Sequence, residues 1–161
     1  MVKLGMEPDA TPVAQKPRHV AYHLQKPLKS WLEQGIKHDL FEKVPEVEAI
    51  TWCSPLLMQP KPKVADIQNE DLQSEMIRAS IDMRIPNTQM KRSRYVQAPI
   101  VEDFTYSLHN CKLDLRQGYH QLTLDHESRS VPTFSTPLGK YRPKRLIFGA
   151  KLYHDCGFSV P

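Results

Sequence analysis

Apolar residues follow a helical period near the start of the chain. They fall at i, i+4, i+7, i+8 and i+12, and so line one face of a helix. The residues on this stripe are Leu24, Leu28, Trp31, Leu32 and Ile36. Pro27 suits the first turn of such a helix and Gly35 suits its end, so the pattern predicts a helix over about residues 26–36. Trp31 could be a stacking platform, but its position on the stripe favours a core anchor.

Residues 1–20 show no such period, which predicts a disordered or extended lead-in. Further along, alternating apolar and polar residues predict short strands. One strand is expected near 51–59, in a segment divided by prolines, and another over 77–85, ended by a Pro-Asn pair. Residues 64–76 between them are acidic and carry no period, which favours a surface insertion or the tip of a hairpin.

The second half of the chain interleaves helix and strand. A basic linker at 90–99 leads to a predicted helix near 99–109, which a proline opens. A short strand, KLDL, follows, and the alternation resumes in RQGYHQLTL. Residues 133–149 predict a strand hairpin that turns at Leu138 and Gly139. The expected fold class is therefore α+β.

Composition narrows the class of protein. A length of 161 residues fits one domain, and 14 prolines favour a loop-rich chain over a helical bundle. No apolar run reaches the ~18 residues that span a bilayer, and the N-terminus lacks the apolar stretch of a secretory signal. We therefore expect an intracellular protein, of cytoplasm or nucleus, without a membrane partner. The net charge of +4 favours nucleic acid only weakly, and 3 widely spaced cysteines provide neither a disulfide framework nor a metal-binding pair.

The segment LDLRQGYHQ carries the strongest local chemical signal. An aspartate at the exposed end of an apolar strand, followed by a turn glycine, can present a carboxylate together with free backbone amides. Such a carboxylate suits Mg²⁺, which also binds substrate phosphates. From the residues alone, the commoner role for Asp114 would be to cap the turn before Gly118.

Five segments in order resemble reverse transcriptases of gypsy-class LTR retrotransposons. KLDLRQGYHQL is similar to the first catalytic motif of that family, and FSTPLGKYRPKRLIFGA is similar to the segment that follows it there. Upstream, YHLQKPLKSWLEQGI, WCSPLLMQPKPK and IRASIDMRIPN resemble the opening helix, the Ser-Pro strand with its lysine-rich turn, and the strand patterned R-x-x-x-D-x-R-x-x-N. The matches are collinear from about residue 17 to 151. The resemblance implies the fingers and an incomplete palm sheet of a reverse transcriptase within a Pol polyprotein.

The resemblance also implies roles for individual residues. Asp114 would be catalytic, and its carboxylate and the backbone carbonyl of Leu115 would bind Mg²⁺ as the cofactor. Tyr119 would stack under the incoming sugar and select against a 2′-hydroxyl group. Lys61 and Arg78 would grip the phosphates, since an arginine fork can meet two phosphate oxygens while a lysine acts as a point charge.

Four more positions complete the implied nucleotide site. Gln117 and Gly118 would supply amides near the triphosphate. Phe148 and Gly149 would belong to a short strand that lines the base and the sugar. Template-primer and dNTP would then be the partners, and RNA-directed DNA polymerisation would be the reaction.

Simpler interpretations stay open for several of these residues. Arg78 could be a solvated residue at a strand edge, Lys61 lies in an exposed turn between prolines, and Tyr119 could belong to the core. Asp82 and Arg84 share a strand face, which favours a structural pair over metal ligands.

Three departures from the family pattern bear on activity. Fewer residues than usual separate the helix near 99–109 from the LDL strand, so Asp114 is expected to be misplaced. The tail at 152–161 diverges from the helix that follows in the family. No Asp-Asp pair occurs in the sequence, and one aspartate cannot hold the two ions, ~3.5–4 Å apart, that phosphoryl transfer needs. We therefore expect the chain to be inactive alone, with a longer polymerase chain as a candidate partner.

These expectations divide the chain into a lead-in at 1–20, a fingers-like region at 21–98, a partial palm at 99–151 and a divergent tail at 152–161. A second hypothesis is a non-catalytic module that binds nucleic acid through two basic runs, and a third is a decayed product without function. Phosphate neutralisation by the basic runs would give binding that is blind to sequence and steep in salt. The residues expected to contact nucleic acid are Lys91, Arg92, Arg94, Lys144 and Arg145.

Overall fold

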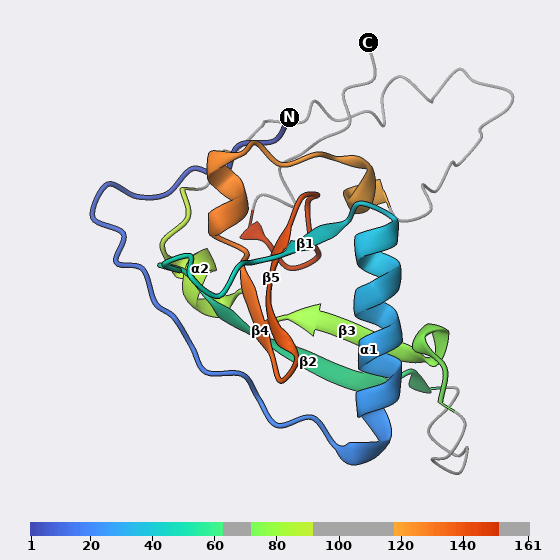
Figure 1. Ribbon diagram of the computed structural model, residues 1–161. Coiled ribbons are helices and arrows are strands. Elements are labelled where there is room, and N and C mark those ends of the chain that lie inside the picture. Colours follow the sequence, from blue (N-terminus) through green and yellow to red (C-terminus); the bar gives the residue numbers. More distant parts are fainter. Residues whose placement is uncertain (63–71, 92–117, 152–161) are drawn as a thin grey trace, which may run out of the picture.

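The structure is a computed structural model that describes residues 1–62, 72–91 and 118–151. In these residues one long helix lies beside a curled sheet of five strands, and short helical turns join the strands (Figure 1). This mixture of helix and sheet agrees with the expected α+β class. The predicted helix near 99–109, the KLDL strand and the divergent tail lie outside the described residues.

Helix α1 spans Tyr22–Lys37 and confirms the helix predicted from the apolar stripe. The buried leucines of this stripe are Leu24, Leu28 and Leu32. Trp31 is half-buried, and its ring centroid lies 4.9 Å from that of Phe41, so it is the core anchor that its position predicted. Gly35 was expected at the end of the helix but lies buried inside its last turn, against the Phe41 ring.

The strands of the sheet lie in the order β1–β5–β4–β2–β3. Their bounds are β1 Phe41–Lys43, β2 Ser54–Pro60, β3 Ile77–Ile81, β4 Phe134–Thr136 and β5 Gly139–Pro143. Neighbouring strands pair antiparallel except β2 and β4, which are parallel. The predicted hairpin is confirmed, because β4 and β5 pair up to Thr136 and Gly139. Gly139 has a φ of +128°, which favours glycine at this turn.

The strand predicted over 77–85 ends early, so that its last residues were predicted wrongly. After β3 the chain turns into a short helix, α2, which spans Arg84–Thr88. The Asp82 carboxylate accepts hydrogen bonds from the Arg84 side chain and, at 3.4 Å, from its backbone N–H. Such local side-chain bonds compete with a strand ladder, and Pro86 fits within the first turn of the new helix.

Short 3₁₀ helices connect the remaining described segments. They are η3 Ser74–Met76, η5 Gly118–Gln121 and η6 Glu127–Ser130. The alternation in RQGYHQLTL predicted a strand, but its described part begins with η5. Only isolated β-bridges pair the following residues, Thr123 with Arg145 and Leu124 with Val2, among the described residues. Glycine weakens a strand interior, and Gly118 lies where the strand was expected.

Two clusters of buried apolar side chains form the core. The first cluster lies between α1 and the sheet and consists of Val20, Leu24, Leu28, Leu32, Phe41, Leu56, Leu72, Ile77, Phe134 and Tyr141. The second cluster consists of Leu4, Trp52, Met83, Met90, Leu124, Val131, Leu146 and Ala150. Ile81, at the end of β3, packs against both clusters and so joins the two parts of the core.

Residues 1–20, expected to be disordered or extended, form an extended segment that packs on the second cluster. Figure 1 shows this segment in blue, running along one side of the molecule before α1 begins. Leu4 is buried in the second cluster. Isolated bridges fix the segment at three pairs of residues, Val2 with Leu124, Met6 with Met90, and Ala14 with Cys53. This packing could not be predicted from the sequence, because the segment pairs through its backbone and has no apolar period.

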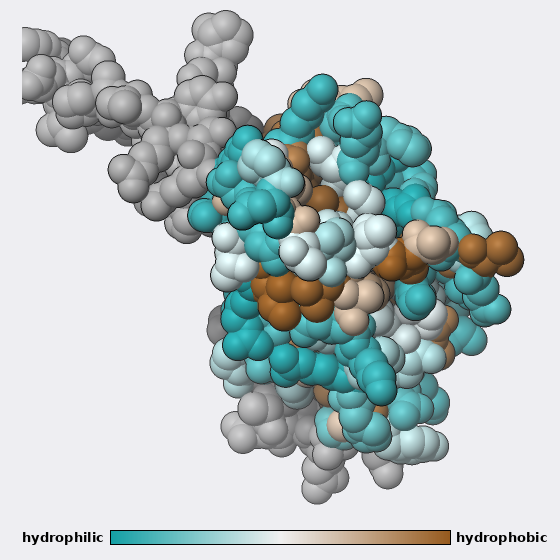
Figure 2. Space-filling view, turned by 90° about the vertical axis from the view of Figure 1, so that its left-hand side faces the viewer, coloured by the Kyte–Doolittle hydropathy of each residue, from teal (hydrophilic) through white to brown (hydrophobic). Residues whose placement is uncertain are grey.

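The surface of the described part is mixed in polarity. Figure 2 shows one face, on which hydrophilic residues predominate and hydrophobic residues form small separate groups. None of the helices within the described residues is both long and apolar enough to cross a membrane. Exposed large apolar side chains include Tyr22, Val47 and Phe148. Phe148 belongs to the predicted nucleotide site, so its exposure bears on function.

Candidate nucleotide and nucleic-acid site

The structure describes part of the predicted site. The predicted residues outside the described ranges are Arg92, Arg94, Asp114, Leu115 and Gln117. The predicted residues that it does describe are Lys61, Arg78, Lys91, Gly118, Tyr119, Lys144, Arg145, Phe148 and Gly149.

The two predicted phosphate-gripping residues lie on one β-hairpin. Arg78 of β3 pairs with Gln59 of β2, and the Lys61 N–H donates to the Met76 carbonyl at 2.9 Å, which continues the ladder past β2. Because side chains alternate between the faces of a strand, Lys61 lies on the same face as Gln59 and Arg78. Both cations are exposed, and neither forms an ion pair with another described residue. The hairpin thus presents two free positive charges on its solvent face.

Tyr119, His120 and Phe148 form a second group, which we call the aromatic corner. The ring centroids of Tyr119 and Phe148 lie 4.5 Å apart with an interplanar angle of 70°, an edge-to-face contact. His120 lies 5.7 Å from Phe148 in a similar orientation. The fold thereby brings together the two residues predicted to line the sugar and the base, although they lie far apart in sequence.

The backbone beside Phe148 is a glycine turn. Gly149 has a φ of +92°, and a Cβ atom added there would meet no atom within 4 Å. Its carbonyl accepts a hydrogen bond of 2.6 Å from the side-chain amide of Asn87 in α2. Gly118, which precedes Tyr119, is buried at the start of η5. Each aromatic residue of the predicted pair therefore adjoins a glycine.

His120 connects the aromatic corner to the basic segment after β5. The Arg145 side chain donates to the His120 carbonyl at 3.2 Å. Burial lowers the pKa of the His120 imidazole, and the positive charge of Arg145 lowers that pKa further. Its Nδ1 atom is buried without a hydrogen-bond partner among the described residues. At neutral pH the ring is thus an uncharged aromatic surface.

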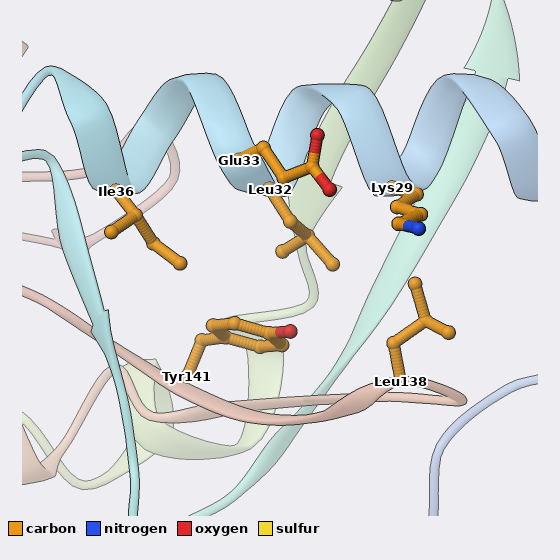
Figure 3. Close-up of a pocket in the computed structure, with 6 residues that line it drawn as sticks. All are labelled: Lys29, Leu32, Glu33, Ile36, Leu138 and Tyr141. Carbon is orange, nitrogen blue, oxygen red and sulfur yellow. The ribbon is translucent and has the colours of Figure 1, made fainter.

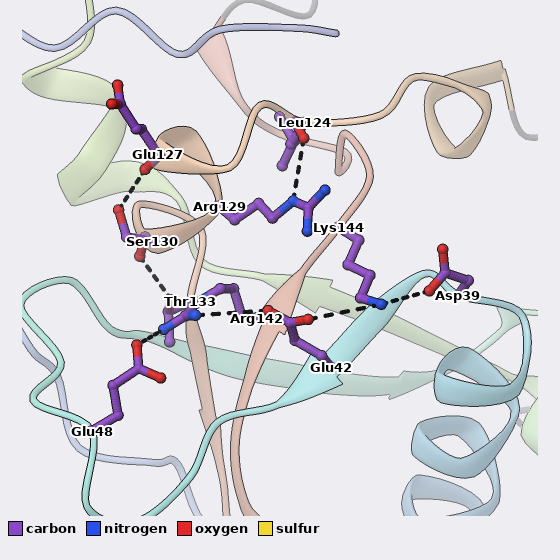
Figure 4. Close-up of polar contacts among 10 residues, drawn as sticks. All are labelled: Asp39, Glu42, Glu48, Leu124, Glu127, Arg129, Ser130, Thr133, Arg142 and Lys144. Atoms are coloured by element: carbon purple, nitrogen blue, oxygen red, sulfur yellow. Dashed lines mark hydrogen bonds and ion pairs between the residues drawn. The ribbon is translucent and has the colours of Figure 1, made fainter.

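The two basic residues after β5 have partners within the chain, which are carboxylates for Lys144 and backbone carbonyls for Arg145. The Lys144 ammonium lies 2.7 Å from a carboxylate oxygen of Asp39 and 3.8 Å from one of Glu42 (Figure 4). Arg145 donates to the Asp39 backbone carbonyl at 3.2 Å. The hydrogen bond from Lys144 is the chief reason why the pKa of Asp39 is lowered. Lys144 and Arg145, which were expected to contact nucleic acid, therefore tie β5 to the end of α1.

Two other cations, Arg142 and Lys91, differ in their partners. Arg142 pairs with Glu48, and its guanidinium lies 3.7 Å from a carboxylate oxygen of Glu42 (Figure 4). The Lys91 N–H donates to the Gly5 carbonyl at 2.9 Å, while its exposed side chain has no ion pair in the described part of the chain. Lys91 is therefore available to phosphate in a way that Arg142 is not.

Asp82 and Arg84 form the structural pair that their spacing favoured. The Asp82 carboxylate is 5% exposed and lies 2.7 Å from the Arg84 guanidinium. Arg18, from the N-terminal segment, reaches the same carboxylate at 3.0 Å. The pKa of Asp82 is lowered, chiefly by the hydrogen bond from Arg84. These contacts make Asp82 a structural anchor between the N-terminal segment and α2.

An apolar groove lies away from the predicted site. It has a volume of about 250 Å³ and runs between α1 and the β4–β5 hairpin (Figure 3). Its lining residues are Lys29, Leu32, Glu33, Ile36, Leu138 and Tyr141. None of them was a predicted site residue, and the stripe residue Ile36 is 46% exposed at its margin.

The potential metal ligands are spread apart in the described residues. These residues contain no cluster of three or more His, Cys, Asp or Glu side chains that could hold an ion. Cys53 is buried with a free thiol, whose pKa burial raises. The Mg²⁺ ligands implied by the resemblance, Asp114 and the Leu115 carbonyl, lie outside the described ranges.

The sequence did not indicate three residues that organise this region. They are Asn87, His120 and Asp39, and each makes its contacts with residues more than 20 positions away in sequence. Asn87 ends the R-x-x-x-D-x-R-x-x-N pattern, which was the available signal for it. His120 lies within the KLDLRQGYHQL motif, while no pattern marked Asp39.

Comparison with known proteins gives one informative match. No protein-family model matches the chain. The chain is 35% identical over 115 residues to the retrovirus-related Pol polyprotein from transposon 412 of Drosophila melanogaster. The match covers 69% of this chain and 9% of that relative, so the chain spans a small part of the polyprotein.

Proposed function

We propose that this chain, which shares its origin with a retroelement Pol polyprotein, supplies the fingers and first part of the palm of an RNA-directed DNA polymerase. In this proposal it contacts a deoxynucleotide and nucleic acid, and it does not polymerise DNA alone. The chemistry of the full polymerase would be templated addition of deoxynucleotides with two Mg²⁺ ions.

The observation that carries the proposal is the contact between Tyr119 and Phe148. The two residues were assigned to the sugar and base side of the site from separate motifs, and the fold places their rings 4.5 Å apart. Lys61 and Arg78 add support, because they share the solvent face of one hairpin without acidic partners in the described residues. The identity to a Pol polyprotein is consistent with this assignment.

Each group would have a distinct task. Lys61 and Arg78 would neutralise phosphate oxygens, which Arg78 can meet in pairs. Tyr119 and Phe148 would provide an aromatic surface for the sugar and base, and the uncharged His120 would extend it. Mg²⁺, when bound, would neutralise phosphate charge and hold the phosphate group near Asp114.

A thermal-shift titration with dNTP and Mg²⁺ tests the nucleotide part of the proposal. A ligand that binds the native state raises Tm, so we expect a saturable increase with dNTP. Arg78→Ala and Tyr119→Ala should reduce this increase, while Lys26→Ala, an exposed cation on α1, should preserve it. A Tm that does not respond to millimolar dNTP, or an increase that persists in Arg78→Ala, would overturn the proposed site.

A non-catalytic nucleic-acid-binding module is the second candidate. The exposed side chains of Lys61, Arg78 and Lys91 favour it, since they lack acidic partners among the described residues. Such a module would bind an oligonucleotide without any response to dNTP. Oligonucleotide binding that persists when the thermal shift with dNTP is absent would favour this candidate over the polymerase part.

A further inference from the structure

Asn87 joins α2 to the turn that follows Phe148. Its side-chain amide donates to the Gly149 carbonyl at 2.6 Å, and its side-chain carbonyl accepts from the Lys151 N–H at 2.9 Å. One side chain thus satisfies a backbone acceptor and a backbone donor on either side of Ala150. No other hydrogen bond within the described residues satisfies these two backbone groups.

The amide is itself held in place. The Asn87 N–H donates to the Met83 carbonyl at 2.9 Å, and Met83 is 2% exposed in the second cluster. Asp82 fixes the start of α2 through its pair with Arg84. A side chain on a short, anchored helix can therefore act as a rigid support for the turn.

The Lys151 side chain provides a second tie between the same two segments. Its ammonium donates to the Met90 carbonyl at 3.0 Å, just beyond α2. Ala150, between the two residues that Asn87 contacts, is 2% exposed in the second cluster. The turn is thus held on one side by burial and on the other by α2.

Phe148 depends on this support more than a core residue would. Its side chain is 51% exposed, so burial alone does not fix its position. Its ring contacts are with Tyr119 and His120, and its backbone leads directly into the turn at Gly149. Gly149, with its φ of +92°, would not fix the direction of the chain without external bonds.

We infer that Asn87 is a positioning residue that sets Phe148 against Tyr119, so that the aromatic corner is preformed for a nucleotide. The inference deepens the proposed function and rests on it for the nucleotide. Asn suits the task because its amide has both a donor and an acceptor arm. An aspartate of the same shape would keep the bond from Lys151 but would face the Gly149 carbonyl with a second acceptor.

The test combines Asn87→Asp and Asn87→Ala with Thr88→Ala as a neighbouring control. Thr88 is exposed, and its hydroxyl donates to the Ile85 carbonyl within α2. Two-dimensional NMR follows the ring-to-ring contacts between Phe148 and Tyr119, and a titration with dNTP and Mg²⁺ gives the affinity. We expect both Asn87 variants to lose the ring contacts and to bind dNTP about tenfold more weakly, while Thr88→Ala matches the original chain.

The outcomes separate the positioning role of Asn87 from the proposed function. Ring contacts and affinity that are unchanged in Asn87→Asp would overturn the positioning role, even if Asn87→Ala does not fold. A second outcome is that Asn87→Asp loses the ring contacts while the original chain does not bind dNTP. This outcome would support the positioning role and overturn the proposed function. Ring contacts and affinity lost together, with Thr88→Ala unaffected, would support both.

Discussion

At the scale of single residues, Asp82 shows how a buried charge holds distant segments together. Its carboxylate accepts from Arg84 in α2 and from Arg18 in the N-terminal segment. The lowered pKa means that the folded state favours the ionised carboxylate. The resulting stabilisation is complete above the unfolded pKa of about 3.9 and is lost as the pH falls through the lower pKa of the folded state.

The Asp82→Asn variant is therefore expected to be less stable by about 1–3 kcal/mol at pH 7, because it loses charge-assisted hydrogen bonds at a buried position. Below about pH 4 the difference from the original chain should shrink, since the unfolded carboxyl group takes up a proton first, and it should disappear once the folded carboxyl group is protonated as well. Urea denaturation between pH 7 and pH 3 measures both effects. Asp9→Asn, at an exposed position, is the matched control. A difference that stays constant across this pH range would refute the account.

Single residues also differ in whether their contacts could be predicted from the sequence. Asp82 and Arg84 are two positions apart, so their pairing was predictable from spacing alone. Lys144, which was predicted to contact nucleic acid, also lies 2.7 Å from Asp39, 105 positions away in sequence. An ion pair between residues close in sequence can be predicted from their spacing. A pair between distant residues can be seen only in the fold, because the pairing of the strands brings the two residues together.

At the scale of elements, Gly35 explains how the loop after α1 packs. A Cβ atom at this position would lie 1.8 Å from the Phe41 ring, far inside contact distance. The sequence suggested a helix-ending glycine, yet the helix continues to Lys37. The need for glycine therefore comes from the close approach of β1, which the helical period of α1 cannot show.

We predict that Gly35→Ala lowers the free energy of unfolding by about 1–3 kcal/mol through overpacking. This loss should outweigh the gain of roughly 1 kcal/mol that alanine brings to a helix interior. Urea denaturation measures the change, and Gln34→Ala, on the exposed side of the same turn, provides the control. The double variant Gly35→Ala with Phe41→Leu should recover part of the loss. A Gly35→Ala variant more stable than the original chain would contradict the close packing.

The elements themselves were predicted to different degrees. Periodicity identified α1 and most of β3, because each buries one face. The β4–β5 hairpin was also predicted, although β4 is buried along its whole length. Periodicity failed at Asp82, where a local hydrogen bond turns the chain, and at Gly118, where η5 begins in place of the expected strand. The aromatic corner needed the fold as well, since no period links Tyr119 to Phe148.

At the scale of the whole molecule, the cations that have no acidic partner among the described residues predict how nucleic acid binds. We expect weak, sequence-blind binding of a single-stranded oligonucleotide. Arg78→Ala and Lys91→Ala should each reduce the slope of log affinity against log salt by about 0.7. Lys144→Ala should leave the slope unchanged, because its ammonium is engaged by Asp39. Fluorescence anisotropy over a salt series measures this, and a larger loss in Lys144→Ala than in Arg78→Ala would contradict it.

The isolated chain is expected to show no template-directed primer extension with either Mg²⁺ or Mn²⁺. Its sequence contains no Asp-Asp pair, and one aspartate cannot hold the two ions that the reaction needs. A primer-extension assay with a labelled primer and all four dNTPs tests this. Measurable incorporation that disappears in Asp114→Ala would show that the chain is active by itself.

The N-terminal segment makes the second cluster part of one folded unit. The Val2 N–H donates to the Thr123 carbonyl at 2.8 Å, and the Leu4 N–H donates to the Ser128 hydroxyl at 3.0 Å. Further along, the Gln15 N–H donates to the Cys53 carbonyl at 2.8 Å. These bonds join the segment to parts of the chain that lie far away in sequence, so its removal would expose the second cluster.

A single substitution tests this role without removing the segment. Leu4 is 8% exposed within the second cluster, so Leu4→Ala should lower the free energy of unfolding by about 2–4 kcal/mol through lost burial and a new cavity. Val47, which is 98% exposed, provides the control, since Val47→Ala removes apolar atoms that pack on nothing. Urea denaturation followed by tryptophan fluorescence is suited to the measurement, because Trp52 lies in the same cluster. If Leu4→Ala were as stable as Val47→Ala, the segment would be dispensable, and the second cluster would have to hold together through Trp52 and the residues after β3.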